Sequence, residues 1–224
     1  MRHKAATMKQ NKGGVAVVID VVRFSTTVCA LLKAGRKTIL AVETPERLKK
    51  IPGLDRADVF SELGFDAPGR RFDNSPFEAL RLKSPNRKAY ITTTTGTKAL
   101  WACRGAERVF IGCFANFSAV LNRLKTEKRS IRFVPAALKE SGMPEDELCA
   151  EAFQAALRGE KDTAKKALAW INASDRIGQF IKIRPQTGAE DLKLCLKLDC
   201  LPLMPEARWP NTTGASLFAK VRKA

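Results

Sequence analysis

Two hydroxyl-rich turns of this chain have the residue types that hold an oxyanion. In the first, ITTTTGT, an apolar strand pattern runs into Thr94, Thr95, Gly96 and Thr97, which open a helical pattern. Such a turn offers backbone N–H groups, hydroxyl donors and a helix N-terminus to one small volume. Gly96 also permits a close approach of the backbone to a ligand. Because threonine is common in strands, a purely structural turn is the alternative.

The second turn, DVVRFSTT, begins at Asp20. This aspartate stands at the carboxyl end of a strand pattern, where open α/β sheets place ligands, and is either a Mg²⁺ ligand or a helix cap. Arg23 could bind phosphate or sulfonate, or pair with a neighbouring acid. Ser25 and Thr26 crowd the same turn. Aspartyl-phosphate phosphatases need an acid two residues after the nucleophile, and Val22 excludes that mechanism. Together the two turns predict a small polyanionic ligand.

Acids and amides elsewhere in the chain could complete such a site. A long connection rich in turn-forming residues carries Glu62, Asn74 and Ser75, and binding residues concentrate in long loops. Asn74 could equally form a turn, and Ser75 could cap a helix. Glu145 and Asp146 open a helical pattern, where acids favour the helix dipole. Two adjacent acids could equally complete a metal site.

Charge and histidine content narrow the chemistry. The 224 residues carry a net charge of +17, and seven cations at the two ends leave +10 (17 minus 7) for the body of the chain. This charge favours anionic ligands and could hold RNA or DNA loosely. No basic run is interleaved with aromatic residues, so specific nucleic-acid recognition is disfavoured. The single histidine, His3, lies near the N-terminus, which argues against Ser-His-Asp hydrolysis and His-ligated metal sites.

Cysteine usage and hydropathy bear on location. The six cysteines form no C-x-x-C pair, which favours buried free thiols in a reducing cytosol. No run approaches the roughly 18 apolar residues of a membrane helix. The basic N-terminal segment has no apolar core of a secretory signal. The sequence therefore predicts a cytoplasmic protein that does not enter a membrane, and it leaves a homo-oligomer open.

Strand-like and helix-like segments alternate along the chain, which predicts an α/β fold with a mainly parallel sheet. Strands are predicted at residues 15–19, 38–42, 58–60, 89–92, 108–111 and 131–134. Helices are predicted at residues 26–34, 45–50, 76–82, 97–104, 116–125, 144–158, 163–172 and 174–183. The leucines of residues 191–199 alternate, which makes a strand one reading of that segment.

The organisation predicted from these patterns has three parts: a disordered basic tail over residues 1–14, a domain over 15–205, and an irregular basic tail over 206–224. Residues 19–42 and 91–111 echo each other, since each runs from a strand through a hydroxyl-rich turn and a helix to a second strand. The echo is compatible with two similar βαβ lobes, a pseudo-repeat of residues 15–85 and 86–205, or with chance similarity.

Six motifs, in order from about residue 15 to residue 202, resemble the 2-phosphosulfolactate phosphatase family, the Mg²⁺-dependent ComB-type phosphatases of coenzyme M biosynthesis. They are VVIDVVRFSTT, FDNSPFEAL, TTTTGTKAL, IGCFANFSAV, PEDELCAEA and LCLKLDCLP. The resemblance implies a ComB-like α/β fold and a cytoplasmic hydrolase that converts 2-phospho-3-sulfolactate to 3-sulfolactate and phosphate. It carries over these residues: Asp20, Arg23, Ser25, Thr26, Asn74, Ser75, Thr94, Thr95, Gly96, Thr97, Asn116, Glu145, Asp146 and Cys149.

The resulting hypothesis is a Mg²⁺-dependent phosphomonoesterase acting on a small acidic phosphate ester. Asp20, Glu145 and Asp146 would hold the metal, and Asp20 and Asp146 would serve catalysis together with Glu62, the candidate acid or base. The substrate-binding residues would be Arg23, Ser25, Thr26, Asn74, Ser75, Thr94, Thr95, Gly96, Thr97 and Asn116. Leu63 replaces an arginine that is usual in the family. The alternatives are therefore altered substrate choice, or a catalytically altered member that binds anions or nucleic acid.

Overall fold

The computed structural model describes residues 13–62, 68–82, 86–210 and 218–224. In this part of the chain nine strands form one sheet, in the order β4-β3-β5-β2-β9-β8-β6-β1-β7. The strands are β1 (Val15–Ile19), β2 (Ile39–Ala41), β3 (Asp58–Ser61), β4 (Arg70–Asp73), β5 (Ala89–Ile91), β6 (Arg108–Gly112), β7 (Ile131–Pro135), β8 (Pro205–Arg208) and β9 (Ala219–Lys223). The α/β class predicted from the alternation is confirmed.

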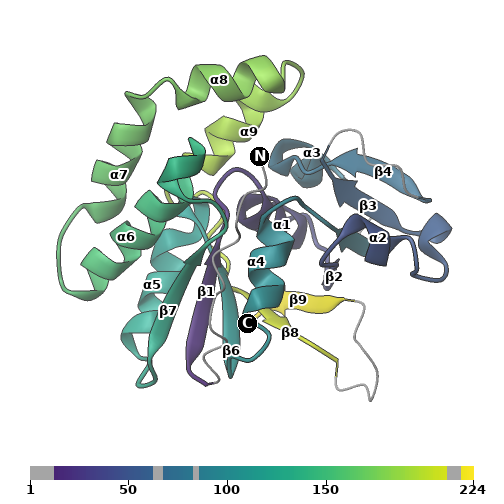
Figure 1. Cartoon of the computed structure of the whole chain (residues 1–224), viewed down its shortest axis with the longest axis horizontal. Coiled ribbons are helices and arrows are strands. Elements are labelled where there is room, and N and C mark those ends of the chain that lie inside the picture. Colours follow the sequence, from purple (N-terminus) through teal and green to yellow (C-terminus); the bar gives the residue numbers. More distant parts are fainter. Residues whose placement is uncertain (1–12, 63–67, 83–85, 211–217) are drawn as a thin grey trace.

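Helices connect and cover these strands (Figure 1). They are α1 (Phe24–Lys33), α2 (Pro45–Leu48), α3 (Pro76–Arg81), α4 (Gly96–Ala102), α5 (Phe117–Lys125), α6 (Glu145–Leu157), α7 (Thr163–Asn172), α8 (Arg176–Ile183) and α9 (Gly188–Cys195). Thr44 and Ser75 cap α2 and α3 through their side chains, each followed by a proline in the first turn, as their sequences predict. No helix within the described ranges is long and apolar enough to cross a membrane.

The sheet consists of two parallel halves joined by an antiparallel centre. On one side β1 pairs in parallel with β6 and β7, and on the other β5 pairs in parallel with β2 and β3. Between them β6–β8, β8–β9 and β9–β2 are antiparallel, so the two halves run in opposite directions. In Figure 1 the strands β7, β1 and β6 stand upright, β8 and β9 run across to the right of the lower part of β6, and β3 and β4 lie at the upper right. The sheet curves between its two halves. As a result, the turns that follow β1 and β5, at the carboxyl ends of strands in opposite halves, come close to each other.

The two similar units seen in the sequence, β1–α1–β2 and β5–α4–β6, occupy equivalent places in this sheet. The first strand of each unit pairs with the second strand of the other, since β1 lies against β6 and β5 against β2. The second strands are followed toward the centre by β8 and β9. Each half of the sheet therefore takes strands from both sides of residue 85. The two units interlock and are not successive lobes along the chain.

The prediction of an irregular tail over residues 206–224 is wrong for its described residues. Strands β8 and β9 form the centre of the sheet, with Ala207, Ala219 and Val221 buried. Their sequences, PEAR and AKVRK, place arginine and lysine between few apolar residues, which is the composition of a solvated tail. Only the pairing of β8 with β6 and of β9 with β2 reveals them as strands.

Two further segments differ from the sequence reading. The alternating leucines of residues 191–199 do not form a strand, because α9 ends at Cys195 and buries Leu192 and Cys195 at the three-residue spacing of a helix. The long connection before Asn74 contains the edge strand β4, whose side chains are exposed or only partly buried. A short edge strand with two arginines gives little periodic signal.

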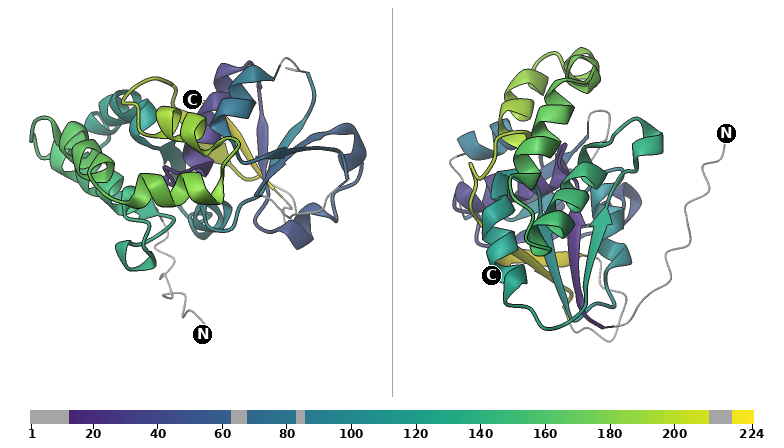
Figure 2. Two further views of the ribbon diagram at one scale, coloured as in Figure 1. Left: turned by 90° about the horizontal axis from the view of Figure 1, so that it is seen from above. Right: turned by 90° about the vertical axis from the view of Figure 1, so that its left-hand side faces the viewer.

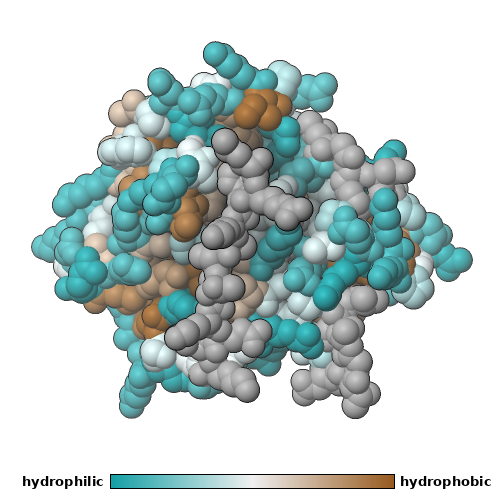
Figure 3. Space-filling view, in the orientation of Figure 1, coloured by the Kyte–Doolittle hydropathy of each residue, from teal (hydrophilic) through white to brown (hydrophobic). Residues whose placement is uncertain are grey.

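The principal hydrophobic core lies between the sheet and the helices of its upright half. Strand β1 (VAVVI) is buried along its whole length, as its continuous apolar run predicts. Phe117, Phe133 and Phe153 stack in a row that joins α5, β7 and α6. Figure 2 shows α6 to α9 gathered on one side of the molecule and β3 and β4 on the other. Figure 3 shows hydrophobic patches mainly over the half that carries α5, α6 and β7.

Candidate active site

The turn after β1 and the turn after β5 meet at the junction of the two sheet halves. The hydroxyl of Thr95 donates to Oδ2 of Asp20 at 3.4 Å. A Cβ at Gly96 would overlap both Oδ2 of Asp20 and the side chain of Phe24. The sequence reading attributed this glycine to ligand approach. In the structure the missing side chain lets one turn pack directly against the carboxylate of the other.

Asp20 is a buried carboxylate with a capping role in its own turn. Its Oδ1 accepts from the backbone N–H of Phe24 at 3.0 Å, at the first residue of α1. Burial raises the pKa of Asp20 to about 7, although the Phe24 N–H opposes the shift, and the charges of Glu62 and Glu145 raise it further. The helix-cap reading of this residue is confirmed, and the Mg²⁺-ligand reading stays a prediction. Asp20 caps a helix, and its proton is exchanged near neutral pH.

Ser25 and Thr26 close this turn from inside. The Ser25 hydroxyl accepts from the backbone N–H of Asp20 at 3.0 Å, and the Thr26 hydroxyl donates to the carbonyl of Val21 at 2.9 Å. Both residues are fully buried. They fix the conformation that presents Asp20 and are not exposed to a ligand.

The threonine turn binds a carboxylate of the protein itself. The backbone N–H and the hydroxyl of Thr94 donate to Oε2 of Glu62, at 2.8 and 2.5 Å. Behind them Thr93 and Thr97 exchange hydrogen bonds between backbone and hydroxyl groups at 3.0–3.1 Å. The turn thus has the donors expected of an anion cradle, and those of Thr94 hold Glu62 beside Asp20.

The first turn of α6 supplies the acids predicted to complete the site. Asp146 accepts from the backbone N–H groups of Val21 at 2.7 Å and Ala137 at 3.0 Å, one on each carboxylate oxygen. Burial and the nearby charge of Asp20 hold the pKa of Asp146 well above its ordinary value. Asp146 therefore joins the loops that follow β1 and β7. Cys149 lies one turn further along, fully buried, and burial raises the pKa of its thiol, which argues against a nucleophilic role.

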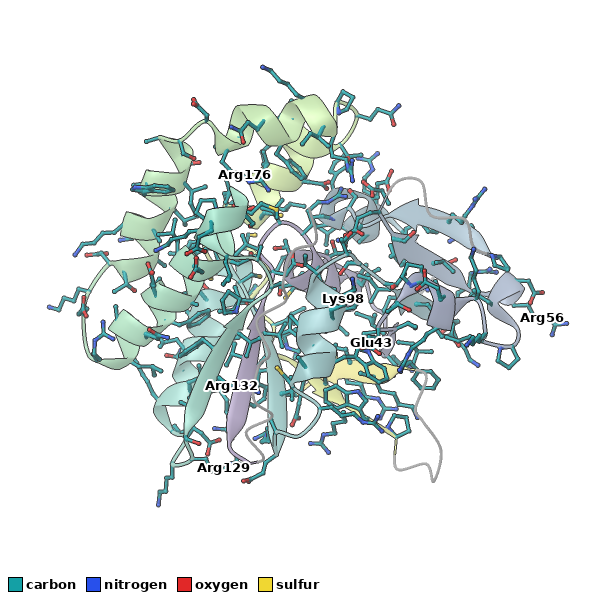
Figure 4. All side chains as sticks on the ribbon, in the orientation of Figure 1. Glu43, Arg56, Lys98, Arg129, Arg132 and Arg176 are labelled. Atoms are coloured by element: carbon teal, nitrogen blue, oxygen red, sulfur yellow. The ribbon has the colours of Figure 1, made fainter. Side chains whose placement is uncertain are left out.

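Glu145 forms a buried ion pair with an arginine of α8. Arg176 donates to it through Nε and Nη2, with a shortest distance of 2.8 Å, and the two side chains are 12% and 2% exposed. Figure 4 shows Arg176 between α8 and the first turn of α6. The charge of Glu145 acts on Asp20, so this pair borders the site. No sequence motif pointed to Arg176.

Arg23 belongs to a second buried network and is not directed at open space. It pairs bidentately with Asp73 at 2.6 and 2.9 Å and contacts Asp191 at 2.8 Å. Ser75 donates to the same Asp191 at 2.6 Å while capping α3. The alternative reading of Arg23, a salt bridge to neighbouring acids, describes this arrangement. Asp73 was not predicted as a partner of Arg23, although it directly precedes Asn74 in the FDNSP motif and could have been considered.

The remaining predicted residues lie apart from Asp20. Asn74 is buried, donates its backbone N–H to the carbonyl of Ser61, and leaves its side-chain oxygen without a hydrogen-bond partner. Asn116 is fully buried and bonds to Cys113, Ile111 and Leu203. It fixes the segment after β6 against the chain near residue 203. Leu63, which replaces the family arginine, falls outside the described residues.

The carboxylates around Asp20 suit a hard cation with few protein ligands. Within the described ranges, no three Asp, Glu, His or Cys side chains converge into a closed metal cage. Mg²⁺ commonly uses only one or two carboxylates, with water and substrate phosphate completing its shell. Asp20 meets that need best, because the contact of its Oδ2 with Thr95 is long and its neighbours Glu62 and Glu145 are anionic. The donor set therefore fits Mg²⁺.

The model of the family described as 2-phosphosulpholactate phosphatase matches residues 2–209. The chain belongs to this family. The matched range contains every residue of the site, and membership makes the protein a phosphoric monoester hydrolase by class.

Curated relatives carry the same description. A protein of Clostridium perfringens named "Probable 2-phosphosulfolactate phosphatase" is 30% identical over 213 residues, which are 87% of this chain and 86% of the relative. One of Symbiobacterium thermophilum with that name is 34% identical over 146 residues, and the match spans 63% of this chain and 62% of the relative. One of Thermoplasma volcanium is 25% identical over 200 residues, 88% and 91% of the two chains.

Proposed function

We propose that this protein hydrolyses 2-phospho-3-sulfolactate to 3-sulfolactate and phosphate in a Mg²⁺-dependent reaction. Family membership supports the reaction class, and the names of the relatives suggest the substrate. The observation that carries the proposal is the buried Asp20, with a pKa of about 7, where two hydroxyl-rich turns meet beside Glu62 and Glu145. A site of this charge and burial suits a cation and a phosphate together.

Asp20 and Glu145 would hold Mg²⁺, which when bound would neutralise negative charge on the phosphoryl group. Asp146 would hold the Asp20 loop in place, because both of its carboxylate oxygens already accept backbone N–H groups. Arg23 would act in the same supporting way through Asp73 and Asp191.

Glu62 is the proposed acid or base of the reaction. Its carboxylate is held by Thr94 at the edge of the site and is only partly buried, so it can exchange a proton with substrate or water. The hydroxyl of Thr95, which lies against Asp20, is placed to donate to an oxygen of the phosphoryl group. No histidine is found within the described ranges, which favours a carboxylate as the group that moves the proton.

The proposed cellular setting is the cytoplasm, where 3-sulfolactate would feed coenzyme M biosynthesis. All six cysteines are free thiols, and five of them are buried. A reducing compartment keeps such thiols in this state.

The proposal is tested by phosphate release from 2-phospho-3-sulfolactate and from generic phosphomonoesters, with Mg²⁺ or with EDTA. We expect release only with Mg²⁺, and a loss of at least about a hundredfold in Asp20→Asn, as for removal of a major electrostatic group. If neither substrate class is hydrolysed and Asp20→Asn changes nothing, the protein is a non-hydrolytic member of the family. The main observation in favour of a non-hydrolytic protein is that Arg23, which was predicted to bind substrate, is paired with Asp73 and Asp191. Steeply salt-dependent RNA binding would identify it as a nucleic-acid-binding protein.

A further inference from the structure

A cavity adjoins the candidate site on the side of Glu145 and Arg176. It has a volume of about 540 Å³ and lies between the start of α6 and the helices α7 and α8. Leu148 and Trp170 form apolar parts of its wall. Its polar lining consists of Lys139, Ser174, Asp175, Arg176 and Gln179, so two cations face one acid. An acid with a short carbon chain meets both kinds of surface there.

The guanidinium of Arg176 lies on the wall shared by this cavity and the carboxylates. On one side it contacts Glu145 through two nitrogens, and on the other it lines the cavity. The ring of Phe180 lies 5.6 Å from the guanidinium carbons of both Arg176 and Arg23, which holds α8 against the site. Lys139, at the same cavity, pairs with Glu151, and both side chains are about half exposed.

A metal ion held by Asp20 and Glu145 would compete with Arg176 for the Glu145 carboxylate. A cation held by Asp20 and Glu145 weakens the hold of Glu145 on Arg176, because both positive charges then share one anion. A guanidinium that is 12% exposed is costly to leave unpaired. An acidic group of a ligand in the cavity removes that cost. Binding of the cation and binding of the acid should therefore strengthen each other.

We propose that Arg176 exchanges Glu145 for the non-reacting sulfonate of the substrate, so that Mg²⁺ and the sulfonate end bind cooperatively. This inference rests on the proposed function and adds the recognition of a second strong acid on the phosphate ester. A second cavity, of about 380 Å³ beside Arg184, suits this role less well, because two acids, Asp73 and Glu78, line it, whereas Asp175 is the one acid lining the cavity at Arg176.

The test measures Mg²⁺ affinity by calorimetry on the full chain, alone and with saturating 3-sulfolactate or lactate. Lactate keeps the carboxylate and hydroxyl but lacks the sulfonate. In the wild type we expect 3-sulfolactate to tighten Mg²⁺ binding about tenfold, within the usual range of coupling between sites, and lactate to have little effect. No turnover is needed, because the ligand is the product.

Arg176→Gln should bind Mg²⁺ more tightly than the wild type in the absence of ligand, because Glu145 has lost its competitor. The effect of 3-sulfolactate should disappear in this variant. Arg176→Lys keeps the charge but not the two-nitrogen contact, should retain part of the coupling, and serves if Arg176→Gln does not fold. Arg158→Gln is the matched control, since Arg158 follows the other end of α6, pairs with Glu160 and is 64% exposed. It should behave as the wild type.

Equal tightening by 3-sulfolactate in the wild type and Arg176→Gln would overturn the inference, as would equal effects of 3-sulfolactate and lactate on the wild type. These outcomes are separate from failure of the proposed reaction. A wild type that shows the coupling but releases no phosphate from any ester rejects the reaction and retains the acid-binding cavity.

Discussion

Asp146 accepts a hydrogen bond of 2.7 Å from the backbone N–H of Val21, which ties the first turn of α6 to the loop that carries Asp20. Its other oxygen accepts from Ala137 after β7. Val21 and Ala137 are 116 residues apart in the chain (137 minus 21), yet one carboxylate sets the separation of their loops. The position of Asp20 thus depends on α6 as much as on β1.

Asp146→Asn should weaken the fold. Each carboxylate oxygen of Asp146 accepts a backbone N–H, and the amide nitrogen that replaces one of these oxygens cannot accept a hydrogen bond. We expect a loss of about 1–3 kcal/mol in the free energy of unfolding, measured by urea titration. Asp162→Asn is the control, since the Asp162 side chain is 58% exposed and pairs with Lys165 on the surface. Equal urea midpoints for the two variants would contradict the structural role of Asp146.

Gly96→Ala should damage both stability and activity, because the added methyl group overlaps Asp20 and Phe24. Overpacking of this kind costs about 1–3 kcal/mol, and separating the two turns should also lower kcat. Gly105→Ala is a close control, because a Cβ there meets no atom within 4 Å. Thermal unfolding and phosphate release on both variants measure the difference. If Gly96→Ala and Gly105→Ala have the same melting temperature and the same rate of phosphate release, the close packing at Gly96 matters for neither stability nor activity.

Arg23→Ala should destabilise the protein strongly, because it removes the guanidinium that pairs with the buried Asp191 and leaves Asp73 only the more distant Arg184, at 3.8 Å. Removing one partner of a buried pair costs about 3–5 kcal/mol. Arg56→Ala should change the free energy of unfolding by less than about 0.5 kcal/mol, since its side chain is 91% exposed (Figure 4). Denaturant unfolding compares the two. A stable Arg23→Ala protein with only a raised KM would instead restore the substrate-binding role expected from the sequence.

The pKa of Asp20 predicts how stability depends on pH in the metal-free protein. The value rises from 3.8 to about 7 on folding, so the folded state binds more protons than the unfolded state between these limits. Stability should therefore fall as pH rises from about 4 to about 7. Three pKa units correspond to roughly 4 kcal/mol. Urea unfolding in EDTA should show a smaller fall in Asp20→Asn. Parallel pH curves for the two proteins would mean that Asp20 has an ordinary pKa.

The sequence predicted that the two hydroxyl-rich turns meet, but not the contacts that the turns make. Asp20 and Thr95 were recognised because polar residues at strand ends are a local signal, and the parallel sheet brings such ends together. The partner of Thr94 was not predicted, since Glu62 follows another strand and its contact depends on the order of strands in the sheet. Arg176 gave no signal at all. A helical pattern shows which face of α8 is apolar, but not that the helix packs over Glu145.

Glu62→Gln tests the proposed proton transfer most directly. Glutamine keeps an oxygen that can accept from Thr94, so the turn should stay in place and the melting temperature should change little. It cannot take up or release a proton at neutral pH, so kcat should fall by about 10²–10⁴-fold. Glu107→Gln is the matched control. Glu107 also accepts a backbone N–H, from Gly14, and it pairs with Arg129 rather than with a residue of the candidate site. Thr94→Val should give an intermediate loss, because it removes the 2.5 Å hydrogen bond but keeps the carboxylate. If Glu62→Gln and Glu107→Gln are equally active, Glu62 only supports the threonine turn, and another group moves the proton.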